Sequence, residues 1–239
     1  MKNDTREENE QDASSLRTMN HILTGDAREL SLSIPDESID LIFTDPPYPP
    51  EYLPLYGWLA KEAKRVLKPD GFLLTYSGCL WKDQVMYQLG QHLTFFWDYI
   101  IVHAGSSQLL LHRFTQANYK SILAYVNKCS GQPRPRRIVQ GLWTSPHQDK
   151  RFHAWGQDET TARYYIDCFS SPGDVIWEPF TGGGTTPYVC KQLGRQFIAF
   201  EIDPLQATIA RKRLETTQPL LMPEEIPQLE LMLESEGVA

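Results

Sequence analysis

The sequence predicts one α/β domain with a mostly parallel sheet. Short apolar runs of β-branched and aromatic residues alternate with longer segments whose apolar residues recur at helical spacing. Strands joined by helices in this way form a parallel sheet with right-handed crossovers. A length of 239 residues, with 41% hydrophobic and 22% charged residues, suits one globular domain of this class.

The first half of the chain carries two strands that each end near an acidic residue. Residues 20–24 form a strand followed by Gly25 and Asp26, and residues 39–43 form a strand shortly before Asp45. Two prolines follow Asp45 and cannot donate ladder hydrogen bonds, so this strand must stop there. Asp26 fits a turn or a helix N-cap.

The remaining elements follow from the same patterns. Residues 68–71 break the chain after the first long helix. The predicted helices are residues 51–67, 80–89, 160–169, the stretch from the triple glycine to 193, and 204–214. The further predicted strands are residues 72–76, 95–102, 121–126, 174–177 and 196–200, with a loop between the second and third of these.

A triple-glycine turn follows the strand that Glu178 ends. Gly182–Gly184 allow positive φ and bring the backbone close to a ligand. Glu201 ends the next strand, 19 residues after Gly182, where a carboxylate can accept hydrogen bonds from both hydroxyls of a ribose. Asp203 competes for that role, but it fits better as the N-cap of the following helix.

Three of these acidic residues are predicted to lie on one edge of the sheet. Asp26, Asp45 and Glu178 each stand at the carboxyl end of a strand. Parallel α/β sheets bind their ligands at that edge. The sequence therefore places a ligand site between segments that are more than a hundred residues apart.

The step Thr44–Tyr48, with the sequence TDPPY, carries groups that can hold an exocyclic amine on a flat base. The carboxylate of Asp45 and the carbonyl of Pro46 can each accept one N–H, which draws the nitrogen toward a tetrahedral shape. Tyr48 can stack on the ring. The alternative is an ordinary proline-rich turn in which Asp45 is a turn residue.

Two motifs together resemble a known family. Asp45–Tyr48 resembles the catalytic motif of the amino-methyltransferases, which methylate adenine N6 or cytosine N4 in DNA with S-adenosylmethionine (SAM). Glu178–Thr186, EPFTGGGTT, resembles their SAM-binding loop, and the resemblance covers roughly residues 20–214. The catalytic motif comes first, as in the permuted β-type members. The resemblance implies a Rossmann-like SAM methyltransferase sheet that is circularly permuted.

The resemblance also implies roles for individual residues. Asp26 would contact the adenine ring of SAM. Gln157 precedes Asp158 and Glu159, where many relatives have Lys-Pro, so no role is assigned there. The implied catalytic residues are Asp45, Pro46, Pro47 and Tyr48. The implied cofactor-binding residues are Asp26, Asp45, Glu178, Phe180, Gly182, Gly184, Thr185 and Glu201.

The charge distribution indicates a polyanionic partner. The net charge is −7, yet residues 99–148 contain six Lys or Arg and no Asp or Glu, so the rest of the chain carries −7 − 6 = −13. Residues 128–151 are predicted to form the target-recognition segment, with the loop 105–116 beside it. The predicted DNA-binding residues are Arg113, Lys128, Arg134, Arg136 and Arg137. The alternatives are that the absence of acidic residues from 99–148 arose by chance and that residues 128–151 form an ordinary solvated loop.

The tails and the cellular context complete the prediction. The domain is expected at 19–216, after an acidic disordered tail at 1–18 and before a tail or short helix at 217–239. No signal peptide or membrane span is expected, because the N-terminus is polar and no apolar stretch is long enough to cross a bilayer. No metal site is expected, because the four cysteines are far apart. A cytoplasmic protein of bacterial, phage or mobile-element origin fits these expectations. A homodimer and a cognate restriction endonuclease are left open.

The predicted reaction is methyl transfer from SAM to adenine N6 in double-stranded DNA after base flipping. Asp before the prolines favours adenine, and cytosine N4 is the alternative. An RNA base or a catalytically silent DNA-binding module stays open. A protein glutamine amide is disfavoured, because such relatives usually carry Asn in place of Asp45 and place the SAM loop first.

Overall fold

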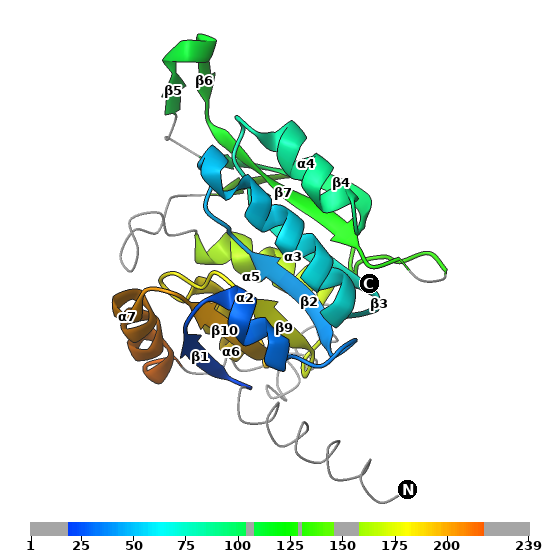
Figure 1. The fold of residues 1–239 in the computed structure, drawn as a ribbon, viewed down its shortest axis with the longest axis vertical. Helices are drawn as coiled ribbons and strands as arrows, with labels where there is room; N and C mark the ends of the chain where they lie inside the picture. Colours follow the sequence, from blue (N-terminus) through cyan, green and yellow to red (C-terminus); the bar gives the residue numbers. More distant parts are fainter. Residues whose placement is uncertain (1–18, 104–107, 129–130, 146–157, 218–239) are drawn as a thin grey trace, which may run out of the picture.

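The computed structural model describes residues 19–103, 108–128, 131–145 and 158–217. Within these residues, eight strands form one sheet that is covered by helices on both faces (Figure 1). The predicted tail at 1–18 lies outside this part of the chain, and so does the predicted tail at 217–239 except for its first residue, Thr217. No helix in the described ranges combines the length and the apolar character that a membrane span requires.

The strand order of the sheet is β1-β10-β9-β2-β3-β7-β4-β8. Every neighbouring pair is parallel except β3–β7 and β4–β7, so β7 runs against the other strands. The prediction of a mostly parallel sheet is confirmed. The strands are β1 (His21–Thr24), β2 (Ile39–Thr44), β3 (Leu67–Ser77), β4 (Thr94–His103), β7 (Tyr119–Val126), β8 (Leu142–Ser145), β9 (Val175–Glu178) and β10 (Gln196–Glu201).

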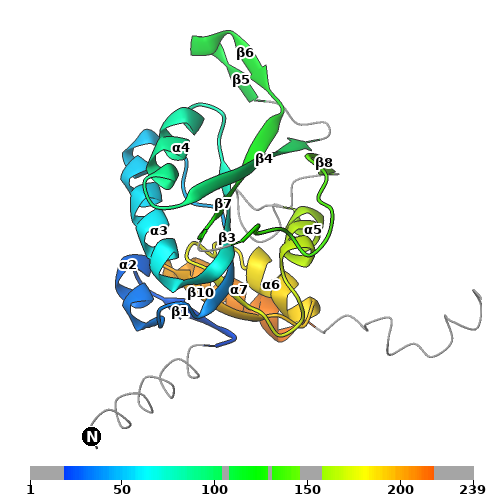
Figure 2. The same ribbon diagram turned by 90° about the vertical axis from the view of Figure 1, so that its right-hand side faces the viewer.

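The helices divide between the two faces of the sheet (Figure 2). Strand β2 shows the reason, because Leu41 and Phe43 belong to one core cluster and Ile42 belongs to the other. The first cluster packs on α5 (Glu159–Phe169), α6 (Thr185–Gln192) and α7 (Pro204–Glu215). The second packs on α2 (Ala27–Leu30), α3 (Leu53–Val66) and α4 (Lys82–Gly90).

Three features differ from the predictions. The predicted loop after β4 contains a hairpin of β5 (Gln108–Leu110) and β6 (Thr115–Ala117). Residues 128–151, the predicted target-recognition segment in which no strand was predicted, contribute β8, which pairs in parallel with β4. Strand β3 begins at Leu67, so the predicted breakers at 68–71 lie inside it. The last two differences depend on partners distant in sequence, because β8 pairs with β4 and Leu67 pairs with Ile39, and a local pattern does not reveal such partners.

Candidate active site

Four acidic residues lie at the ends of four neighbouring parallel strands. Asp26 follows β1, Glu201 ends β10, Glu178 ends β9 and Asp45 follows β2. These strands are adjacent and run in the same direction, so the four acids share one edge of the sheet, here called the carboxyl edge. The structure therefore brings together the residues that the sequence placed at strand ends.

Glu178 connects the two motifs. Its side chain is buried, with 3% of the residue exposed, and it accepts hydrogen bonds from the Thr44 hydroxyl (2.6 Å), the Thr186 hydroxyl (2.9 Å) and the Phe180 N–H (2.9 Å). Burial raises the pKa of Glu178 to about 8, although these hydrogen bonds act in the opposite direction. The carboxyl group is therefore mostly protonated at neutral pH.

The glycine turn is braced by a second acid. The Glu201 carboxylate accepts hydrogen bonds from the N–H of Gly182 (2.7 Å) and of Asp203 (2.9 Å). Gly184 has a φ of +80°, and a Cβ there would lie 2.9 Å from the Cβ of Ala210 in α7. Only glycine fits this position without a shift in its neighbours.

Arg213, on α7, also binds the glycine turn. Its buried guanidinium donates to the Gly183 carbonyl (3.0 Å) and the Thr185 hydroxyl (3.1 Å), and it pairs with Glu159 at 2.7 Å. Arg213 was not among the predicted site residues. The hydroxyl of Thr185, a predicted cofactor-binding residue, already has this partner within the fold.

Asp26 adopts one of its two predicted roles. It is the N-cap of α2, accepts a hydrogen bond from the Arg28 N–H (2.8 Å) and forms an ion pair with the Arg28 side chain (2.6 Å). Hydrogen bonding to Arg28 lowers the pKa of Asp26.

Phe180, another predicted cofactor-binding residue, lies edge-to-face with Trp58, with ring centroids 6.2 Å apart.

The step after β2 contains a hydrogen-bonded chain of three side chains. The Tyr48 hydroxyl donates to Asp45 Oδ1, and Lys120 Nζ donates to the Tyr48 hydroxyl at 3.1 Å. The Lys120 ammonium also lies 4.7 Å from the centroid of the Tyr48 ring. Burial and the neighbouring Asp45 carboxylate raise the pKa of Tyr48 well above its ordinary value. Lys120 was not among the predicted site residues, although it lies in the acid-free stretch.

Buried polar groups without partners surround this step. In the described part of the chain, the hydroxyls of Tyr56 and Tyr76 and both ring nitrogens of His103 are buried and lack a hydrogen bond. Burial first, and then the charge of Asp45, raises the pKa of both tyrosines. Burial lowers the pKa of His103, and Lys120 lowers it further. Unused donors and acceptors beside Asp45 are the arrangement that a polar ligand needs.

The predicted DNA-binding residues fall on two edges of the sheet. Arg113 lies in η3 (Leu111–Arg113), in the hairpin that leaves the carboxyl end of β4. Lys128 and the three arginines that follow it lie beyond the end of the antiparallel strand β7, at the opposite edge. There the Arg136 N–H donates to the Cys168 carbonyl (2.8 Å), and Arg137 pairs with Asp167 (2.6 Å). The structure therefore separates Lys128 and the three arginines from the acids of the carboxyl edge, whereas Arg113 lies on the same edge as those acids.

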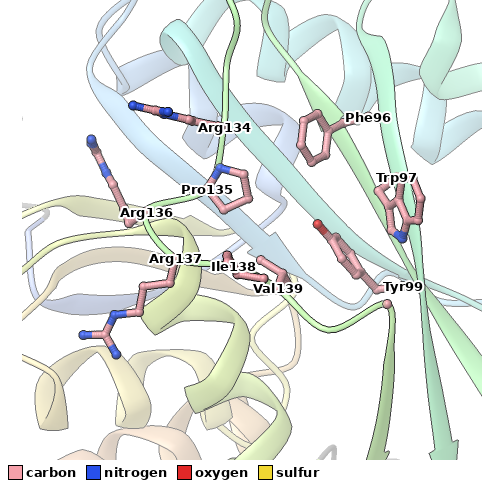
Figure 3. Close-up of a pocket in the computed structure, with 10 residues that line it drawn as sticks. Phe96, Trp97, Tyr99, Arg134, Pro135, Arg136, Arg137, Ile138 and Val139 are labelled. Carbon is pink, nitrogen blue, oxygen red and sulfur yellow. The ribbon is translucent and has the colours of Figure 1, made fainter.

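The three arginines border an open groove of about 750 Å³ (Figure 3). Phe96, Trp97 and Tyr99 form its aromatic wall, and the guanidinium groups point away from that wall. The other end of the predicted target-recognition segment, residues 146–151, lies outside the described residues.

Comparison with known proteins gives consistent matches. A family model described as DNA methylase matches residues 115–212. The type II methyltransferase M.BamHI of Bacillus amyloliquefaciens is 27% identical over 81% of this chain, and M.HinfI of Haemophilus influenzae is 27% identical over 92%. The chain spans 56% of the length of M.BamHI and 74% of M.HinfI.

Solved structures show the same fold. TTHA0409 from Thermus thermophilus, in complex with SAM, superposes with a TM-score of 0.69 at 21% identity, covering 84% of this chain and 97% of that one. The cytosine-N4-specific PvuII DNA methyltransferase gives a TM-score of 0.72 at 17% identity, covering 90% and 92%. The chain has the Rossmann-like fold of these methyltransferases, and its sequence is similar to that of DNA methyltransferases of the adenine-N6 and cytosine-N4 type.

Proposed function

We propose that this chain methylates the N6 amine of adenine in double-stranded DNA, using SAM, after the base is flipped out of the duplex. The observation that carries the proposal is the adjacency of β2 and β9, which places the Asp45 step beside the glycine turn. The proposal assigns residues 19–216 to the methyltransferase domain.

The residues on the carboxyl edge fit SAM. The carboxylate of Glu201 accepts from two backbone N–H groups, and its remaining lone pairs are available for ribose hydroxyls. The Asp45 and Glu201 carboxylates of this edge favour a cationic ligand and would repel a phosphorylated ribose. Gly182 has a φ of +51° and no side chain, so the backbone there can approach a ligand closely. When bound, SAM supplies a methyl group on a positively charged sulfur.

The Asp45 step fits the amine that receives the methyl group. We assign the Asp45 carboxylate and the Pro46 carbonyl as acceptors for the two N–H groups, which makes the nitrogen lone pair available. Tyr48 would stack on the base. Because Lys120 lies over the Tyr48 ring, its ammonium must leave this face of the ring when a base stacks there. A phosphate of the target strand is a suitable partner for the displaced ammonium.

Adenine is preferred over cytosine because Asp45 precedes the two prolines. The test incubates the protein with isotope-labelled SAM and unmethylated bacterial DNA, digests the product to nucleosides and weighs them. We expect labelled N6-methyl-2′-deoxyadenosine. Labelled N4-methyl-2′-deoxycytidine would reassign the base, and label in an RNA substrate alone would reassign the polymer. No label in any nucleoside, from protein that binds SAM, would contradict the enzymatic proposal.

A further inference from the structure

The hairpin β5–β6 projects from the carboxyl edge of the sheet (Figures 1 and 2). Its two strands pair from Gln108–Ala117 to Leu110–Thr115, and η3 with Phe114 forms the tip. Three apolar side chains of this hairpin face solvent. The exposed fractions are 64% for Leu109, 70% for Leu111 and 97% for Phe114. A cluster of exposed apolar side chains at the end of a protruding element indicates a partner.

The tip holds Phe114 in an uncommon backbone conformation. Its φ is +47°, in the left-handed region that bulky residues rarely adopt. The Phe114 N–H donates to the Leu111 carbonyl (3.1 Å), and the Thr115 hydroxyl donates to the Arg113 carbonyl (2.8 Å). Backbone strain of this kind, combined with an exposed ring, points to a functional contact.

Charge and shape favour DNA as the partner. The hairpin lies within residues 99–148, which contain no acidic residue, and Arg113 stands next to Phe114. A second copy of this chain would also be negatively charged, with a net charge of −7. The density of negative charge on the DNA backbone is far higher, so DNA is the stronger electrostatic partner for this hairpin. A two-stranded ribbon fits the major groove of B-DNA, and apolar side chains such as Phe and Leu are known to insert between base steps.

The hairpin is joined directly to the Asp45 step. At its base, the His103 N–H donates to the Asn118 carbonyl (2.9 Å). Lys120, six residues after Phe114, donates to the Tyr48 hydroxyl. Six extended residues span at most about 20 Å. A duplex held by the hairpin tip would therefore lie beside Tyr48.

We propose that the hairpin tip enters a groove of the target duplex and that the Phe114 ring fills the gap left by the flipped base. Arg113 binds an adjacent phosphate. This inference rests on the proposed function, because a flipped base requires a substrate for base methylation.

The test compares Phe114→Ala with Tyr87→Ala on duplex and on heat-denatured unmethylated bacterial DNA. Tyr87 is a suitable control because it is 66% exposed on α4, away from the hairpin. We expect Phe114→Ala to slow methylation of duplex DNA by at least about tenfold, the effect of losing one stacking contact. Denatured strands leave no gap to fill, so their rate should change less than about twofold. Phe114→Trp should retain duplex activity, and Tyr87→Ala should change neither rate.

Three outcomes would overturn the inference. Unchanged duplex methylation by Phe114→Ala would show that the ring has no role. Equal losses on duplex and denatured DNA would indicate a general defect. A smaller sedimentation coefficient for Phe114→Ala than for wild type would reassign the tip to self-association. If the wild-type protein methylates neither substrate, the proposed function is contradicted and not the contact between the hairpin and DNA. That contact is then tested by binding alone, and Phe114→Ala should lower the affinity for duplex DNA.

Discussion

The hydroxyl of Thr44 donates a 2.6 Å hydrogen bond to the buried carboxyl of Glu178, across 134 residues of sequence. Thr44 directly precedes Asp45, and Glu178 opens the segment that contains the glycine turn. The same carboxyl also holds Phe180 and Thr186. One buried acid thus fixes the position of the proposed base-binding step relative to the proposed cofactor turn.

Replacing Asp45 should remove catalysis while retaining cofactor binding. Asp45→Ala and Asp45→Asn should each lower the methylation rate by about 10²–10³, as for the loss of one charged group that stabilises a transition state. SAM affinity, measured by calorimetry, should change little. Wild-type turnover in either variant would refute the catalytic assignment of Asp45, and thermal melts check that both variants fold.

Glu178 should make stability depend on pH. Its folded-state pKa of about 8 exceeds the ordinary value of 4.5, so the folded state binds more protons between these values. Its contribution to stability is therefore present in full below pH 4.5 and is lost as the pH rises through 8. Glu178→Gln is neutral at every pH. Its amide oxygen can accept the hydrogen bonds from Thr44 and Phe180, and its amide nitrogen can donate one to the Thr186 hydroxyl.

The measurement is the melting temperature of both proteins between about pH 5 and 8. Wild-type protein should lose stability relative to Glu178→Gln as the pH rises. Parallel profiles would show that the carboxyl group is charged throughout this range.

Gly184 and Gly173 form a matched pair of substitutions. Both have positive φ, +80° and +88°, but an added Cβ meets Ala210 at Gly184 and nothing within 4 Å at Gly173. Each change to alanine should cost about 1–2 kcal/mol for the left-handed backbone. Gly184→Ala should cost about 1–3 kcal/mol more because of the clash. Urea unfolding gives both values, and equal losses would show that α7 moves aside.

Glu201 and Asp203 can be separated as ribose ligands. Glu201→Gln should weaken SAM binding by about tenfold or more, because a hydrogen bond to a charged acceptor is lost. Asp203 caps α7 by accepting from the Leu205 N–H at 2.8 Å. Asp203→Ala should therefore cost about 1 kcal/mol of stability without a change in SAM affinity. Equal losses of affinity would assign the ribose to both residues.

The edge on which DNA binds can be tested with charge substitutions. Arg113→Ala should weaken binding to duplex DNA and reduce the slope of log K against log salt by about 1. The double substitution Arg134→Ala and Arg136→Ala is at the opposite edge. It should reduce this slope less than Arg113→Ala does, although it removes two charges. The reverse order, measured by fluorescence anisotropy over a salt series, would place the duplex at the aromatic groove.

Much of the fold was predictable because its signals are local. The apolar runs at 39–43 and 196–200 are buried strands, and 204–214 is a helix whose N-cap is Asp203. Acidic residues at strand ends share an edge in any parallel sheet, so the predicted clustering of Asp26, Asp45 and Glu178 followed from the secondary structure.

The direction of β7 was decided only by tertiary structure. Because β7 is antiparallel, it sends Lys128 and the arginines at 134–137 to the edge opposite Asp45. It also leaves Lys120 and the hairpin on the edge of the proposed active site. The bonds of Arg213 to the glycine turn likewise required packing between α7 and that turn. Periodicity shows which residues are buried, but strand direction and side-chain partners depend on contacts between segments distant in sequence.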